Sequence, residues 1–302
     1  TEEHLQVLYD LGFRRVSFGI QDFDPVVQDV INRVQPYENV ERVVKQARAI
    51  GYTSINFDLV YGLPFQRLET IVETIGLVTQ LRPDRIAFYS YAHVPWLKPG
   101  QRKYGEKDLP KDSEKRKLYE QGLEMFTAAG YADVGMDHFA LPGDPLLKAL
   151  NNKTLHRNFM GYTAGYTQLM VSLGASAISD SWDAFSQNYK TVEGYRAAVE
   201  RNEFPIQKGH VLTQEEQVIR KHILNIMCQG GTNWENTGLQ CKDLYEGLKR
   251  TEELVKDGLV EILPYALKVT EKGRAFLRNI CMCFDALYWQ KQPEGKIFSS
   301  AV

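Results

Sequence analysis

The fold is decided by the stretch SFGIQDFDPVVQDVINRVQ, residues 17–35. Apolar side chains alternate up to Ile20, which is typical of a β-strand. The strand then ends in the polar pair Gln21 and Asp22, and Asp24-Pro25 is typical of a helix start. A strand that ends in polar groups and leads into a helix predicts a βα unit, with Arg33 following the helix.

The same order recurs along the first two-thirds of the chain, where a helical segment ends near a glycine and a short apolar strand follows. Spacings of roughly 30 to 48 residues between the strands predict an α/β fold with a parallel sheet. The expected strands lie near residues 15–20, 54–60, 85–92, 132–138 and 174–179.

Five βα units are too few for a (β/α)8 barrel and also for a partial barrel of about six strands. An open first strand would leave backbone groups unpaired. The chain begins at Thr1 without a methionine, within a segment that has a helical pattern. We therefore expect residues 1–205 to form the later βα units of a partial TIM-like barrel, with the first strands and the cluster loop missing.

The pattern changes after Phe204. Thr213 and Glu216 have the spacing of a capping box at the start of a helix. Further on, the segments GLVEIL and ALKVT predict two short strands between helices. We expect residues 206–302 to form a small, mainly helical, winged-helix-like domain.

The composition argues against two classes of partner. The formal net charge is -2, and residues 210–302 hold twelve Lys and Arg against twelve Asp and Glu, so binding to nucleic acid is not expected. No run of eighteen apolar residues and no signal peptide occur, so membrane insertion is not expected. Four cysteines, all in the last quarter of the chain, favour a reducing cytoplasm over a disulfide framework.

Cys281 and Cys283 form a C-x-C pair in the segment NICMCFD. Together with Cys228 and Cys241, they match neither a zinc ribbon nor an iron–sulfur spacing. We interpret them as small buried hydrophobic residues and expect no metal site in this chain.

Polar and aromatic residues follow the predicted strands, and in parallel α/β proteins ligands bind at these carboxyl ends. An Asp after a strand is often only a turn or capping residue, the role that we favour for Asp22 and Asp24. For Gln21 and Asp58 a structural and a binding role are both open. The convergence of these ends on one rim predicts a polar small-molecule site. The residues expected at the rim are Gln21, Asp22, Asp58, Tyr89, Tyr91, Ala92, His93, Asp137, His138, Ser176, Ile178 and Asp180.

The chemistry of this set suits binding. Asp58 can accept hydrogen bonds from two ribose hydroxyls or from an ammonium group, and Arg33 can hold a carboxylate. The chain contains no P-loop, no G-x-G-x-x-G motif and no Ser-His-Asp order. The set suits a zwitterionic nucleoside such as S-adenosylmethionine (SAM).

A family resemblance is carried by the segments FGIQDFDPVVQDVINRVQ, FDLVYGLPFQ, PDRIAFYSYAHVPW, GMDHFA, LHRNFMGYT, GASAIS and RNICMCFD. In this order, from Val16 to Asp285, they resemble the radical SAM enzymes and, among them, the oxygen-independent coproporphyrinogen III oxidases, also called coproporphyrinogen dehydrogenases. The resemblance implies a partial (β/α)6 barrel followed by a helical domain.

The resemblance also implies an activity. A [4Fe-4S] cluster would cleave SAM reductively, and the 5′-deoxyadenosyl radical would take a hydrogen atom from a propionate of coproporphyrinogen III. Loss of carbon dioxide and one electron, twice over, would leave two vinyl groups and give protoporphyrinogen IX for haem biosynthesis. An electron donor and an electron acceptor, both unidentified, are implied partners.

The resemblance assigns roles to five residues. Positions matching Gln21, Arg33, Asp58 and Ala92 line a SAM site in the family. The position matching Ile178 packs on the adenosyl part of the SAM that binds the cluster.

Two family motifs are absent from the chain: the C-x3-C-x2-C cluster motif and the glycine-rich SAM motif. We expect both upstream of Thr1, so that this chain is an N-terminally truncated fragment without a cluster and without turnover of its own. Ser172 also stands where the family pattern predicts a glycine.

A tetrapyrrole with four carboxylates requires cations, and no catalytic residue is assigned. Arg102 and Lys103 in GQRKYG and Arg157 in LHRNF are candidate substrate-binding residues. The alternatives are a haem-binding or haem-modifying relative that acts as a carrier, and a nucleic-acid-binding winged helix, which the neutral charge of the tail disfavours.

Overall fold

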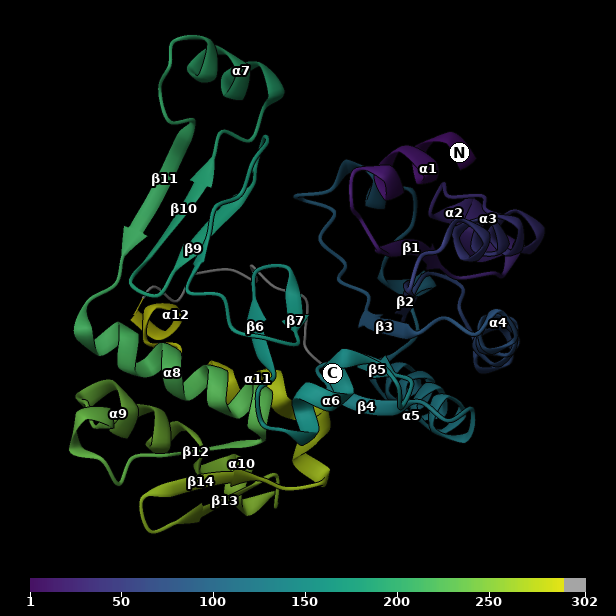
Figure 1. Ribbon diagram of the computed structural model, residues 1–302. Coiled ribbons are helices and arrows are strands. Elements are labelled where there is room, and N and C mark those ends of the chain that lie inside the picture. The colour runs from purple at the N-terminus through teal and green to yellow at the C-terminus, as the bar shows by residue number, and fades with distance from the viewer. Residues whose placement is uncertain (291–302) are drawn as a thin grey trace. The chain divides into compact units, whose positions relative to one another are not determined.

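A computed structural model describes residues 1–290 of the chain, and these form two compact units (Figure 1). Unit 1 ends at Lys148 and unit 2 begins at Ala149, so the division falls within helix α6 (Pro145–Asn151). The predicted boundary at 205/206 lies inside unit 2, between α7 (Val192–Glu200) and β11 (Ile206–Val211), and the domain that it delimits stays a prediction.

Unit 1 is built on a five-stranded sheet with the order β1-β2-β3-β5-β4. The first three strands are β1 (Arg15–Gln21), β2 (Ser54–Tyr61) and β3 (Arg85–Ser90). They pair in parallel, as the sequence predicted for these segments. Their carboxyl ends therefore lie at one edge of the sheet, which we call the carboxyl edge.

The predicted fourth strand is present, but it does not pair with β3: β4 runs in the same direction as β1–β3, and an antiparallel strand that was not predicted lies between them. The segment 132–140 forms a hairpin of β4 (Ala132–Gly135) and β5 (His138–Ala140), and β5 pairs antiparallel with β3. Met136 and Asp137 form the two-residue turn, with φ values of 41° and 70°. Two positive φ angles give the twist that a tight antiparallel hairpin needs, so β5 follows β4 directly, whereas α5 (Asp112–Ala128) connects β3 to β4.

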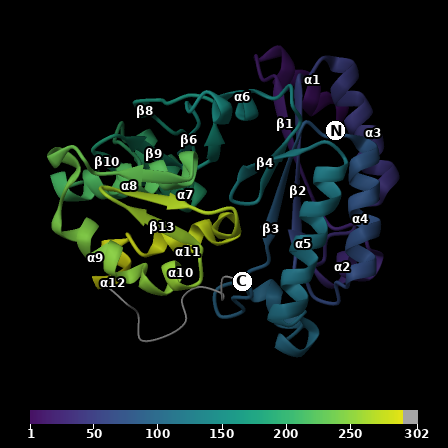
Figure 2. The ribbon, with the colours of Figure 1, turned by 90° about the horizontal axis from the view of Figure 1, so that it is seen from below.

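Helices lie along one face of this sheet (Figure 2). Large side chains between the sheet and these helices are fully buried, among them Phe57, Phe88 and Phe126. Alternate strand residues, such as Ser17 and Asp58, point to the other face, because side chains of a strand alternate. These helices are α1 (Glu2–Asp10), α2 (Pro25–Val30), α3 (Tyr37–Ile50), α4 (Leu68–Leu81) and α5 (Asp112–Ala128). Unit 1 also contains the short 3-10 helices η1 (Pro99–Lys103) and η2 (Glu106–Asp108).

The first half of unit 2 is antiparallel, and the predicted fifth parallel strand is wrong. The expected segment 174–179 overlaps β9 only in part, and β9 belongs to a separate four-stranded sheet with the order β11-β10-β9-β8. Only Trp182 and Asp183 separate β9 from β10, which leaves no room for a crossover helix. The strands are β6 (His156–Asn158), β7 (Gly161–Thr163), β8 (Leu169–Met170), β9 (Ile178–Ser181) and β10 (Ala184–Asn188).

The second half of unit 2 combines helices with a three-stranded sheet of order β12-β14-β13. The predicted capping box is present, since the Thr213 hydroxyl accepts from the Glu216 N–H and the Glu216 carboxylate accepts from the Thr213 N–H. The predicted hairpin is also present. The elements are α8 (Gln214–Gln229), β12 (Gly231–Asn233), η3 (Thr237–Leu239), α9 (Lys242–Arg250), α10 (Glu252–Lys256), β13 (Val260–Leu263), β14 (Ala266–Val269), η4 (Lys272–Phe276), α11 (Leu277–Met282) and α12 (Ala286–Gln290).

The interpretation of the cysteines as small buried residues holds for three of the four. Cys228, Cys281 and Cys283 are buried, and Cys241 is half-buried. Burial raises the pKa of the Cys228 thiol to about 12, so this thiol is protonated at neutral pH. None of the helices within residues 1–290 combines the length and the hydropathy that crossing a lipid bilayer requires.

Two helical glycines test the packing of unit 1. A Cβ on Gly122 in α5 would overlap Phe88 Cε1, whereas a Cβ on Gly76 in α4 would have no atom within 4 Å. We expect Gly122→Ala to lower the free energy of unfolding by about 1–3 kcal/mol through overpacking. Gly76→Ala should raise it by about 0.5–1 kcal/mol, since alanine favours the helix. Urea denaturation measures both, and equal stability of the two variants would contradict the contact between α5 and β3.

Candidate functional site

The register of the parallel strands places three residues side by side within the sheet. Gly19 of β1 pairs with Asp58 of β2, and Asp58 pairs with Ala87 of β3. Neighbouring strands are about 4.8 Å apart, so these three positions form one row across the sheet. Two members of the row have no side chain or only a methyl group, so neither places a bulky side chain beside the Asp58 carboxylate.

The Asp58 carboxylate is half-buried and fixed by two neighbours. Ser17 Oγ donates to its Oδ2 at 2.9 Å, and Asn56 Nδ2 donates to its Oδ1 at 2.8 Å. A carboxylate has about four acceptor positions, so each oxygen retains room for a further donor. The group is thus oriented by the protein and still able to bind hydroxyl or ammonium groups.

Gln21 and Arg33 converge on Gly19 from two different segments. Arg33 Nη2 donates to the Gly19 carbonyl at 2.8 Å. A Cβ on Gly19 would lie 2.7 Å from Gln21 Nε2 and 2.8 Å from Arg33 Nη2. The two polar ends therefore occupy the space that only glycine leaves open. The structure brings together three of the predicted SAM-binding residues: Gln21, Arg33 and Asp58.

The other two predicted cofactor residues lie apart in the chain. Ala92 follows β3 at the carboxyl edge, and its carbonyl accepts from Gln101 Nε2 at 3.0 Å. Ile178 is the first residue of β9 in unit 2, where its carbonyl accepts from Ser172 Oγ at 2.6 Å. Ser172, where a glycine was expected, thus closes the loop before β9. The roles of Ala92 and Ile178 remain predictions.

Asp22 and Asp24 have the structural roles that the sequence favoured. The Asp24 carboxylate caps α2 and accepts from the N–H groups of Val26 and Val27 at 2.9 Å. Asp22 is fully buried, and its Oδ1 accepts from the Asp24 N–H at 2.7 Å in an Asx turn. Burial raises the pKa of the Asp22 carboxyl, while its hydrogen bonds oppose that shift.

Sequence reasoning missed two buried polar residues that support the carboxyl edge. Gln66 accepts from the Gly62 N–H at 2.6 Å, and its Nε2 donates to Asp22 Oδ2 at 2.5 Å. Lys115 of α5 donates to the Tyr91 carbonyl at 3.0 Å, and burial lowers the pKa of its ammonium group. Neither lies at a strand end, so the rule that identified Gln21 and Asp58 could not find them.

Comparisons with known proteins identify the chain. A model of the radical SAM superfamily matches residues 1–78. Oxygen-independent coproporphyrinogen III oxidases from Synechocystis sp. and Escherichia coli are each 39% identical to it, over 310 and 285 residues. The solved structure of the Escherichia coli oxidase, described as a radical SAM enzyme, matches with a TM-score of 0.89 and 38% identity, covering 95% of this chain and 67% of that one. The chain belongs to the coproporphyrinogen III oxidase family.

The chain spans 66% of the Synechocystis oxidase and 62% of the Escherichia coli oxidase. Membership in this radical SAM family implies SAM and a [4Fe-4S] cluster as cofactors. Around Gly19 the chain presents an oriented carboxylate, an amide and a guanidinium, and the chemistry of these groups suits a zwitterionic nucleoside such as SAM. Within residues 1–290, no group of three or more His, Cys, Asp or Glu side chains is placed to hold a metal ion.

The three candidate substrate-binding residues of this chain are divided between the two units. Arg102 and Lys103 lie exposed in η1 of unit 1, where Arg102 Nε donates to the Pro95 carbonyl at 3.1 Å. Arg157 lies in β6 of unit 2, with its Cζ 4.8 Å from the centroid of the Tyr162 ring. One nitrogen of Arg157, Nη1, is buried and has no hydrogen-bond partner among the described residues.

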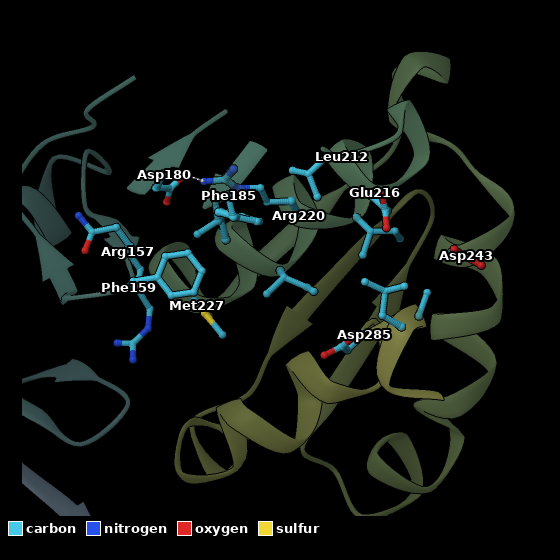
Figure 3. A pocket seen from close by; sticks show the side chains of 16 residues that line it. Arg157, Phe159, Asp180, Phe185, Leu212, Glu216, Arg220, Met227, Asp243 and Asp285 are labelled. Carbon is cyan, nitrogen blue, oxygen red and sulfur yellow. Dashed lines mark hydrogen bonds and ion pairs between the residues drawn. The ribbon is translucent and has the colours of Figure 1, made fainter. Parts of the chain in front are cut away.

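Unit 2 contains a hollow of about 430 Å³ beside α8. Figure 3 shows Asp180 and Arg220 paired on one side of it and Asp243 on the opposite side. Arg220 Nη2 donates to Asp180 Oδ1 at 2.7 Å, and Arg220 Nη1 donates to the Ser181 and Trp182 carbonyls at 2.7 and 3.0 Å. Through these three bonds, Arg220 links α8 to the sheet of unit 2. The hollow is lined by Arg157, Asn158, Phe159, Asp180, Phe185, Leu212, Glu216, Ile219, Arg220, Ile223, Leu224, Met227, Asp243, Asp285, Ala286 and Leu287.

The pair of Arg220 and Asp180 should stabilise unit 2. We expect Arg220→Met to lower the free energy of unfolding by about 3–5 kcal/mol, because it leaves a buried carboxylate unpaired. Arg196→Met is the control: it removes an exposed i,i+4 pair with Glu200 and should change stability by at most about 0.5 kcal/mol. Chemical denaturation measures both, and a small effect of Arg220→Met would show that Asp180 does not depend on its partner.

Proposed function

We propose that the complete gene product is a coproporphyrinogen dehydrogenase. It would convert two propionate side chains of coproporphyrinogen III to vinyl groups, giving protoporphyrinogen IX in anaerobic haem biosynthesis. The single observation that carries this proposal is that Gln21, Arg33 and Asp58 lie together around Gly19. The whole of this chain aligns with part of a named oxidase, at 39% identity. The names of the relatives favour the oxidase over a haem carrier.

We infer a role for each residue toward SAM. Asp58 accepts from the ribose hydroxyls or from the ammonium group, since Ser17 and Asn56 already fix its orientation. Arg33 keeps donors free beyond the one on the Gly19 carbonyl, and these suit the SAM carboxylate. Gln21 offers an amide beside them, Ala92 contributes at the end of β3, and Ile178 supplies an apolar contact to a second adenosyl group.

In the complete protein, a bound cluster would supply the electron that cleaves SAM. The residues of this chain contribute binding and orientation, since they hold the amino acid and ribose groups at fixed positions. The architecture that we propose for the complete protein is a partial (β/α)6 barrel, to which β1, β2 and β3 contribute. Residues 206–302 would form a winged-helix-like domain, of which residues 291–302 lie outside the described part.

The substrate carboxylates call for cations, and Arg102, Lys103 and Arg157 are the residues that we propose for them. Support is strongest for Arg157, because a buried guanidinium nitrogen without a partner is costly and an anion would satisfy it. An electron donor and an electron acceptor complete the set of partners. The four free cysteines support a cytoplasmic location, since thiols persist in a reducing compartment.

The role of Asp58 leads to a binding prediction. We expect Asp58→Ala in the complete gene product to raise the Kd for SAM about 10- to 100-fold, the loss typical of hydrogen bonds to a charged group. The absorbance of the cluster should remain, because Asp58 is not a ligand. Isothermal titration with SAM measures the Kd.

The matched control is Asp29→Ala, which removes an exposed carboxylate on α2 and should leave the Kd unchanged. Loss of the cluster absorbance in Asp58→Ala, or an unchanged Kd, would contradict the proposed role of Asp58.

A further inference from the structure

Gln21 has a backbone conformation that residues other than glycine rarely adopt. Its φ is 66°, and the Asp22 N–H donates to the Ile20 carbonyl at 2.9 Å, so that Gln21 is the central residue of a γ-turn. The register between β1 and β2 shifts at the same place, between Gly19 and Gln21. Such strain persists only where the surrounding structure holds it, and it clusters at functional sites.

The Asp22 carboxyl group holds the end of this turn. It is fully buried and accepts three hydrogen bonds: from Gln66 Nε2 at 2.5 Å, from Thr74 Oγ1 at 2.8 Å and from the Asp24 N–H at 2.7 Å. The donors come from the loop after β2, from α4 and from the start of α2. The residue next to Gln21 is therefore attached to three separate segments.

The direction of the bond between Gln66 and Asp22 is fixed. Gln66 Oε1 accepts from the N–H groups of Gly62 and Leu63 at 2.6 and 3.3 Å. The amide nitrogen of Gln66 must then face Asp22, and both oxygens of Asp22 must act as acceptors. Only a group that accepts on both sides satisfies this arrangement.

We propose that Asp22 is a positioning residue for SAM, which it affects through Gln21. By fixing the γ-turn, Asp22 directs the Gln21 amide over Gly19 and beside Arg33, where Gln21 Nε2 lies 2.7 Å from the place that a Cβ on Gly19 would take. This inference rests on the proposed function, since it assumes that Gln21 contacts SAM.

Asp22→Asn tests the requirement for two acceptors. In either orientation its NH2 group would face a donor, Gln66 Nε2 on one side or the Asp24 N–H and the Thr74 hydroxyl on the other. We expect the Kd of the complete gene product for SAM, from isothermal titration, to rise about tenfold. Asp24→Asn is the matched control: it also removes one carboxylate from this loop, but Asn caps a helix as well as Asp, so the Kd should stay within about twofold.

A double variant separates positioning from a general structural role. Gln21→Gly removes the amide and the strain together, and should itself raise the Kd. If Asp22 acts through Gln21, then Gln21→Gly/Asp22→Asn should bind SAM as Gln21→Gly does, within about twofold. If Asp22 only supports the fold, the two effects should multiply, and that result would overturn the inference.

The remaining outcomes are also decisive. An unchanged Kd in Asp22→Asn, beside a raised Kd in Gln21→Gly, would overturn the inference and leave the proposed function intact. Absence of SAM binding in the wild type, or an unchanged Kd in Gln21→Gly, would instead contradict the proposed SAM site.

If Asp22→Asn does not fold, Thr74→Val is a second test, because it removes one donor and keeps the carboxyl group. Its effect on the Kd should vanish in the Gln21→Gly background, and persistence there would overturn the inference.

Discussion

Parallel pairing of β1, β2 and β3 is the constraint on which the rest of the site depends. Because the strands run in the same direction, the ends that carry Gln21 and Ala92 meet at one edge of the sheet. The register then pairs Gly19 with Asp58, so that a position without a side chain lies beside an oriented carboxylate. A shift of one residue would turn Asp58 into the buried face and remove it from the site.

Buried polar groups hold this edge in place, and each has an electrostatic cost. Burial raises the pKa of Asp22 and lowers the pKa of Lys115, which means that the interior disfavours the charge on both. Their hydrogen bonds offset part of this cost. The same bonds connect separate segments, since Asp22 joins the end of β1 to Gln66 and Lys115 joins α5 to the Tyr91 carbonyl. Asp22 and Lys115 thus help to fix the positions of the site residues without having to contact the ligand themselves.

The sequence predicted the parts of the fold that depend on local pattern. The strands around residues 15–20, 54–60 and 85–92 were found because apolar runs end in polar residues, and Thr213 was found because a capping box has a fixed spacing. The hairpin at Met136 and Asp137 was missed, since its turn lacks the usual Asn-Gly or Asp-Gly signal. The antiparallel pairing of β9 was missed because a short apolar strand has the same sequence pattern in parallel and antiparallel sheets.

Some residues of the candidate site could likewise be predicted from the sequence, and others could not. Gln21 could be predicted because it ends β1, and Asp58 because it is a polar residue in an apolar strand, although it lies three residues before the end of β2. Arg33 could be predicted because the family resemblance points to it. Asp22 was recognised as structural, but its partners Gln66 and Thr74 lie 44 and 52 residues further along the chain, and no local pattern connects them. Long-range hydrogen bonds of this kind are visible only once the strands are placed.

The most direct measurement is a crystal structure of the complete gene product with bound SAM. The account predicts that the ligand lies over Gly19, with its amino acid or ribose groups within about 3.2 Å of the Asp58 carboxylate and the Arg33 guanidinium. SAM bound at another place, with Gln21, Arg33 and Asp58 all out of contact with any SAM molecule, would contradict it.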